Sequence, residues 1–138
     1  MEYVFMDKQT NTPNDWQFLA ERDLSVAEHL ANNMHPLPTE IIVFHCQQAV
    51  EKYLKGALTV LGNDPPYIHD LPKLCKIAES YKSSFGNILT LCSIITHFSV
   101  QPRYDRGISL SDEDMRLVLS HTKTIKEFLQ KEIPKLFE

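Results

Sequence analysis

The stretch TEIIVFHCQQAVEKYLKGALTVLG, residues 39–62, decides the fold class. Its apolar side chains recur at three- and four-residue steps, which is the period of an α-helix, and Gly62 supplies a stop signal. The apolar surface is unusually wide and consists of Ile42, Cys46, Ala49, Val50, Tyr53, Leu54, Ala57, Val60 and Leu61. Such width predicts a helix that contacts several neighbours.

Working outward from this stretch, the same period predicts four more helices. They cover about 12–33, a short segment from Asp70 to about Tyr81, roughly 84–98, and a last helix from Ser111 whose inner face extends to Ile133 and Leu136. Capping residues, prolines and Gly62 separate the helices. We therefore expect an all-α, up-and-down antiparallel bundle of about five helices over residues 12–138, with a flexible arm at 1–11 and a loop at 99–110.

Composition limits the possible functions. A chain of 138 residues fits one domain, and its net charge of −4 gives no overall positive field, so any phosphate site must be local. Three cysteines without metal-type spacing lie among apolar residues, which predicts buried, reduced thiols and a cytoplasmic location. The first residues do not form a signal peptide, and no apolar run approaches the ~20 residues that span a bilayer.

The central stretch also carries two polar stripes. Gln47, Glu51 and Lys55 are spaced four apart, and Gln48 and Lys52 form a second stripe beside them. Two lysines and two amides on one side could hold a phosphate and hydrogen-bond a base edge. The spacing equally suits a solvated face with Glu–Lys pairs, so both interpretations stay open.

A second candidate lies just before the short third helix. Asp70 is placed to cap that helix, which would fix the turn that contains His69. His69 could then hydrogen-bond a neighbouring helix or titrate near neutral pH. The alternative is a capping turn with a packed histidine.

The third candidate is the segment 101–107, where Arg103 and Arg106 flank Tyr104. Arginine forks bind phosphate, and a tyrosine ring can stack on a base. A loop pinned by Arg–Asp pairs is the alternative. The remaining histidines lack metal-ligand spacing, and no glycine-rich nucleotide loop or hydrolase motif occurs, so we expect neither a metal nor a cofactor.

In order, these motifs resemble the HEPN family, the higher eukaryotes and prokaryotes nucleotide-binding domain. The resemblance covers roughly residues 13–135 and depends on Arg22-Asp23-Leu24, on His45 through Gly56, on His69-Asp70-Leu71 and on Arg103-Tyr104-Asp105. It implies a helical bundle, usually a homodimer with a polar cleft near its axis. Many members accompany a separately encoded small nucleotidyltransferase, whereas others are metal-independent endoribonucleases, often toxins.

The ribonuclease members carry an arginine four to six residues before a histidine. Arg116 and His121 match that spacing, but five helical residues rotate roughly 140°, which separates their side chains. His97 resembles the histidine end of the motif at the expected place, where the arginine is missing, so a catalytic pair would be His97 with Arg103.

The leading hypothesis is a nucleotide- or RNA-phosphate-binding homodimer that works with a nucleotidyltransferase partner and with no membrane. Its proposed ligand-binding residues are Gln47, Gln48, Lys52, Lys55, His69, Arg103, Tyr104 and Arg106. One alternative is a metal-independent, toxin-like endoribonuclease. The other is a structural interaction module without a ligand.

Overall fold

The computed structural model describes residues 11–100 and 110–138, and within these ranges the chain is helical and contains no strand. The α-helices are α2 (Pro13–Asn33), α3 (Thr39–Val60), α4 (Leu71–Glu79), α5 (Leu89–Ser99) and α6 (Asp112–Glu132). Two 3₁₀ segments, η1 (Ser83–Ile88) and η2 (Pro134–Phe137), precede α5 and follow α6. The predicted all-α class is confirmed.

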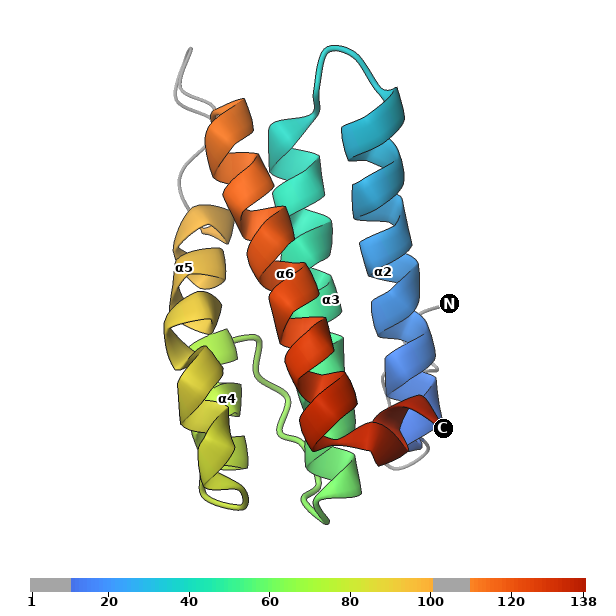
Figure 1. Ribbon diagram of the computed structural model, residues 1–138, viewed down its shortest axis with the longest axis vertical. Coiled ribbons are helices and arrows are strands. Elements are labelled where there is room, and N and C mark those ends of the chain that lie inside the picture. Colours follow the sequence, from blue (N-terminus) through green and yellow to red (C-terminus); the bar gives the residue numbers. More distant parts are fainter. Residues whose placement is uncertain (1–10, 101–109) are drawn as a thin grey trace.

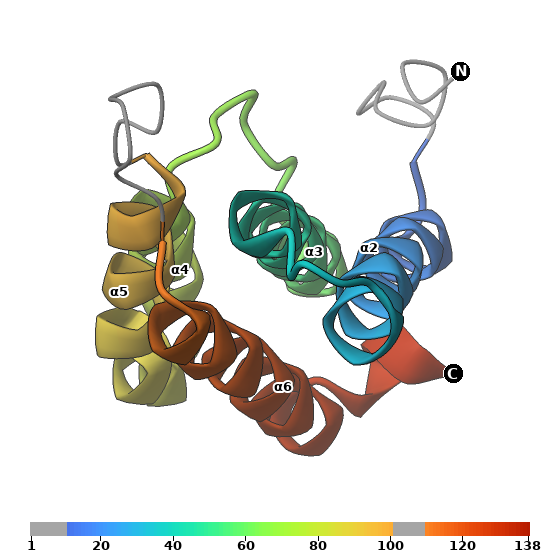
Figure 2. The same cartoon turned by 90° about the horizontal axis from the view of Figure 1, so that it is seen from above.

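The long helices alternate in direction, as Figure 1 shows by the colour gradient along α2, α3, α5 and α6. Helix α3 contacts α2, α4, α5 and α6, and the view from above in Figure 2 places it among them. Residues 49–58 of α3 are all buried, so even its polar side chains face protein. The wide apolar surface of the sequence thus identifies the central helix of the bundle.

Local signals set the helix ends. Thr12 and Asp15 form a reciprocal capping box on α2, and the side chains of Asp70 and Ser111 cap α4 and α6. After α3 the chain turns through Gly62 at φ 90°, a conformation that side chains with a Cβ rarely adopt. The predicted caps at Thr12 and Asp70 are confirmed.

Two predicted helices differ from the structure. The helix expected over 84–98 begins as the 3₁₀ segment η1 and becomes α-helical only at Leu89. The last helix was expected to continue to Leu136 but ends at Glu132, because Pro134 disfavours the helical conformation at the preceding Ile133, which has φ −130° and ψ 63°. Leu136 is still fully buried, now from η2.

The return of η2 to the core depends on Gly56 in α3. A Cβ on Gly56 would lie 2.7 Å from Cδ1 of Leu136 and 3.0 Å from Cβ of Trp16. A side chain at this position would therefore crowd Trp16 of α2 and Leu136 of η2.

Cys46, Cys75 and Cys92 are free and fully buried, as predicted. Apart from Asn11, the predicted N-terminal arm lies outside the described residues. Within the described ranges, no helix combines the length and the apolar character that crossing a membrane requires.

Candidate functional site

The predicted Gln/Lys stripe of α3 lies inside the subunit. The exposed fraction is 1% for Lys52 and 2% for Lys55, and Glu51, which directly precedes Lys52, is fully buried as well. The surface position that the sequence suggested for both lysines is therefore wrong. The physical reason is that the neighbouring helices cover α3 on its polar side as well as on its apolar side.

Lys55 belongs to a row of charges that ends at the surface. Its ammonium group donates to Oε2 of Glu51 at 3.0 Å, and the same oxygen lies 2.8 Å from Nδ1 of His69. Because a carboxylate only accepts, Nδ1 of His69 carries the hydrogen of this bond. The His69 side chain is 77% exposed, so a buried carboxylate orients an accessible imidazole ring.

A parallel row connects α3 to α2. The Lys52 ammonium group donates to Oδ2 of Asp23 at 2.6 Å, and Oδ1 of Asp23 lies 2.9 Å from Nδ1 of His45. Sequence reasoning gave Asp23 and His45 no role, although both belong to the motifs quoted above. Their spacing along the chain could not show that α2 brings Asp23 against α3.

Gln47, by contrast, ties two other segments together. Its side-chain N–H donates to the backbone oxygen of His69 at 3.0 Å, and the Ser99 hydroxyl donates to its Oε1 at 3.2 Å. A cavity of about 450 Å³ opens beside this junction and is lined by Phe44, Gln47, Gln48, His69, Asp70, Thr96, Ser99 and Val100. Three predicted ligand-binding residues, Gln47, Gln48 and His69, thus share one pocket, which we call the α3–α5 pocket.

The third candidate, with Arg103, Tyr104 and Arg106, lies outside the described residues. The two described residues next to this segment are Val100, which lines the α3–α5 pocket, and Leu110, whose backbone oxygen accepts from the Thr39 hydroxyl at 2.9 Å. The described chain thus stops at a residue of the pocket lining and resumes at a residue that is hydrogen-bonded to the first residue of α3.

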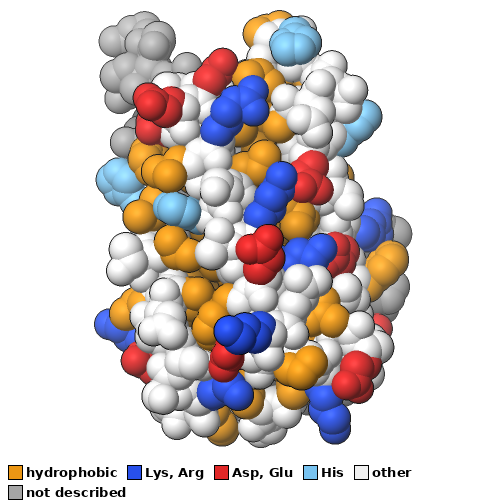
Figure 3. Space-filling model, viewed as in Figure 1, with side chains coloured by type: hydrophobic (Ala, Val, Ile, Leu, Met, Phe, Trp, Pro, Cys, Tyr) orange, Lys and Arg blue, Asp and Glu red, His pale blue; other side chains and the backbone are white. Residues whose placement is uncertain are grey.

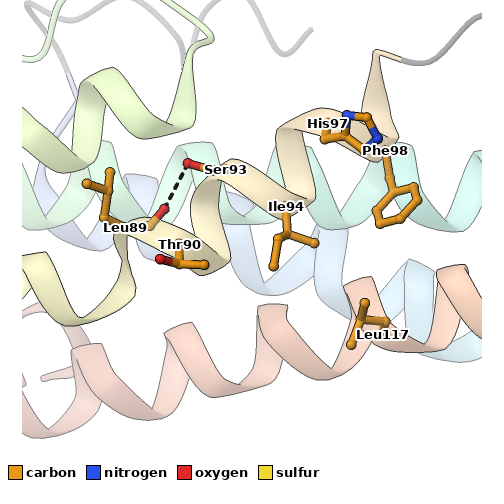
Figure 4. A pocket seen from close by; sticks show the side chains of 7 residues that line it. All are labelled: Leu89, Thr90, Ser93, Ile94, His97, Phe98 and Leu117. Atoms are coloured by element: carbon orange, nitrogen blue, oxygen red, sulfur yellow. Dashed lines mark hydrogen bonds between the residues drawn. The ribbon is translucent and has the colours of Figure 1, made fainter.

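The candidate catalytic residue His97 occupies a different place. It is exposed and lines a groove of about 580 Å³ with Leu89, Thr90, Ser93, Ile94, Phe98 and Leu117, which we call the α5–α6 groove (Figure 4). In the part of the chain that the structure describes, no lysine or arginine lines this groove. The structure does not bring His97 together with Gln48 or His69 in one pocket.

Arg116 and His121 do not meet in one pocket either. Arg116 is exposed and lines a shallow hollow with Leu119, Ser120, Lys123, Thr124 and Glu127, whereas His121 is half-buried and lies outside that lining. Along α6, Figure 3 shows positive and negative side chains interspersed rather than one basic patch.

Titratable side chains elsewhere do not form a metal site. Within residues 11–100 and 110–138, no three histidine, cysteine, aspartate or glutamate side chains are grouped so that they could hold a metal ion.

These features occur on a bundle whose residues 14–133 match the HEPN domain family. Because the match covers most of the 138 residues, the chain belongs to this family. No curated protein and no solved structure matches the chain.

Proposed function

We propose that this HEPN domain binds a nucleotide or an RNA segment in the α3–α5 pocket and acts as a homodimer. The observation that supports this most directly is the junction at Gln47, where hydrogen bonds join α3 to the His69 turn and to Ser99 at the end of α5. Ser99 and Val100 lead directly into the segment that carries Arg103. This continuity along the chain is why the proposal joins the amides of α3 with the arginines of that segment.

In this proposal the ligand contacts come from Gln48, His69 and the 101–107 segment. Gln48 is half-buried and lines the pocket, so its amide can hydrogen-bond a ligand. Arg103 and Arg106 would bind phosphate as bidentate forks, and Tyr104 would stack on a base.

Lys52 and Lys55 act indirectly. Their ammonium groups neutralise Asp23 and Glu51, and these carboxylates orient His45 and His69. In this proposal the two lysines stabilise the carboxylates that orient the histidines. They do not bind phosphate themselves.

The α5–α6 groove is our candidate for the homodimer interface. Helix α5 is the most apolar of the helices, yet only Cys92 and Ile95 of its eleven residues are buried. Leu89, Ile94 and Leu117 line the open groove instead, and hydrophobic side chains gather over α5 in Figure 3. A second copy of the same face would remove this apolar surface from water.

Family membership supports a separately encoded nucleotidyltransferase as a partner, and buried thiols suit the reducing cytoplasm. We propose binding rather than RNA cleavage, because the described lining around His97 holds no lysine or arginine to stabilise a phosphorane.

The test is fluorescence anisotropy with a labelled single-stranded RNA in a chelating buffer at physiological salt. The parent should bind without cleaving the RNA, and Gln48→Ala combined with Arg103→Ala should weaken binding roughly tenfold or more, since two hydrogen-bonding contacts are lost. Arg116→Ala is the control, because Arg116 is equally cationic but lies on α6 away from the pocket. Equal binding by the double variant and the parent would refute the proposal, as would a parent that binds no RNA.

A further inference from the structure

The α3–α5 pocket is rich in hydrogen-bond acceptors. Nδ1 of His69 is engaged by Glu51, so Nε2 of the neutral ring is an acceptor. Oδ1 of Asp70 accepts the backbone N–H of Lys73 at 3.0 Å, and because Asp70 lines the pocket, its second carboxylate oxygen can accept from a ligand. Two acceptors on consecutive residues favour a ligand group that donates hydrogen bonds.

The same lining disfavours an anion. None of the eight residues that line the pocket in the described chain is a lysine or an arginine, and Asp70 is an acid. A phosphate placed against Asp70 would meet a like charge without a compensating cation. Phosphate contacts therefore belong outside the pocket, and the pocket itself suits an uncharged part of the nucleotide.

An aromatic wall completes the pocket. Phe44 lines it and is 50% exposed although it is a large hydrophobic residue on the central helix. A base can stack on such a ring. The volume of about 450 Å³ lies within the roughly 300–1,000 Å³ typical of small-molecule sites.

One hydroxyl in the lining has no partner. Oγ1 of Thr96 is buried and makes no hydrogen bond in the described structure, although it belongs to a residue of the pocket wall. Buried polar groups are normally satisfied, so an unpaired hydroxyl on a residue of this pocket wall favours a polar over an apolar ligand.

We infer that the α3–α5 pocket takes an unpaired nucleobase with an exocyclic amino group, stacked on Phe44 and donating to Asp70 and His69. This inference rests on the proposed function and specifies its ligand class. Cytosine fits because its amino group donates. Uracil has a carbonyl oxygen at the same place, so an acceptor of the base would face the acceptors of Asp70 and His69. A paired base does not fit, because both of its faces are stacked and its amino group has already given one of its two hydrogens to the partner base.

The experiment compares oligocytidine with oligouridine of one length at pH 8, together with an RNA duplex, by fluorescence anisotropy. The two single strands have equal backbone charge and both bases are pyrimidines, so the amino group is the main difference. The parent should bind oligocytidine about tenfold tighter than oligouridine, the size expected for one hydrogen bond to a charged acceptor. It should bind the duplex more weakly than oligocytidine.

Asp70→Asn is the informative variant, because asparagine also caps a helix and keeps the turn while removing the charge. It should lose the preference for oligocytidine. Phe44→Leu should weaken both single strands, whereas Phe18→Leu, an exposed phenylalanine on α2, should leave both unchanged.

Parent protein that binds both single strands equally, or the duplex as tightly as oligocytidine, overturns the base pocket while leaving RNA binding intact. Parent protein that binds none of the three RNAs overturns the proposed function itself, and the inference with it. If Asp70→Asn still prefers oligocytidine over oligouridine, Asp70 does not accept the amino group and the inference is also overturned.

Discussion

Oε2 of Glu51 accepts a hydrogen bond from Nδ1 of His69 at 2.8 Å, although the two residues are 18 positions apart and Glu51 is fully buried. The contact forms because the connection after α3 runs back beside that helix to the start of α4, as its trace in Figure 1 shows. A charge inside the bundle thereby controls the orientation of a ring at the surface. This relationship links the stability of the fold to the proposed site.

The first prediction concerns the buried charge of Glu51. Glu51→Gln leaves the Lys55 ammonium group buried without its counter-charge, which should lower the free energy of unfolding by roughly 3–5 kcal/mol in urea titrations. Glu28→Gln is the control: its pair with Lys123 is exposed, with side-chain exposures of 40% and 49%, and should matter by at most about 1 kcal/mol.

A double replacement, Glu51→Leu with Lys55→Met, separates charge from packing. Removing both charges should recover a large part of the lost stability, because no uncompensated ion is left inside. Equal destabilisation by Glu51→Gln and Glu28→Gln would mean that the Glu51–Lys55 pair is not buried as described.

The second prediction concerns alkaline pH. Burial raises the pKa of the Cys46 thiol from 9.0 to about 12. Above pH 9 the unfolded thiol loses its proton while the folded one keeps it, so the unfolded state is favoured and stability falls as pH rises towards 12. Each such group contributes a slope of up to about 1.4 kcal/mol per pH unit.

Unfolding free energies measured from pH 8 to pH 10.5 test this. Cys46→Ala removes the titrating thiol, so its stability should fall less steeply above pH 9 than that of the parent, whatever constant cost the smaller side chain adds. Parallel curves for parent and variant over this range would show that Cys46 ionises equally well in both states.

The third prediction concerns the α5–α6 groove. Ile94→Asp places a charge in the middle of this apolar groove and should convert a dimer into a monomer in analytical ultracentrifugation, with the helical circular dichroism retained. Val26→Asp, on an exposed valine of α2, is the matched control and should stay dimeric. A parent that is monomeric at high concentration, or a dimer unaffected by Ile94→Asp, contradicts this interface.

Much of the fold could be predicted from the sequence, because its signals are local. The 3.6-residue period, the cap at Thr12 and the stop at Gly62 act within one or two turns of a helix. The end of α6 was predicted wrongly for a reason that is also local. Ile133 and Leu136 fit the apolar period, but Pro134 between them interrupts the helix. Both side chains still reach the core.

The site was harder to predict because it depends on which helices cover α3. The stripe of Gln47, Glu51 and Lys55 has the same spacing whether water or protein lies above it. Whether the polar residues of α3 are buried or exposed depends on partners that are distant in sequence and contact α3 only in the folded chain. These partners are Asp23 for Lys52 and His69 for Glu51. The sequence did identify Gln47, Gln48 and His69 as candidates, and these three line one pocket.

The central claim, that a nucleotide binds in the α3–α5 pocket, can be tested most directly by residue-resolved NMR. At 15.9 kDa the protein is suited to a titration with cytidine 5′-monophosphate followed through the backbone and side-chain amides and the histidine rings. We expect the Gln48 side-chain amide and the His69 ring to shift in a saturable manner, while the resonances of Arg116 on α6 stay in place. Shifts confined to the α5–α6 groove around His97, or no saturable shift at Gln48 and His69, would contradict the account.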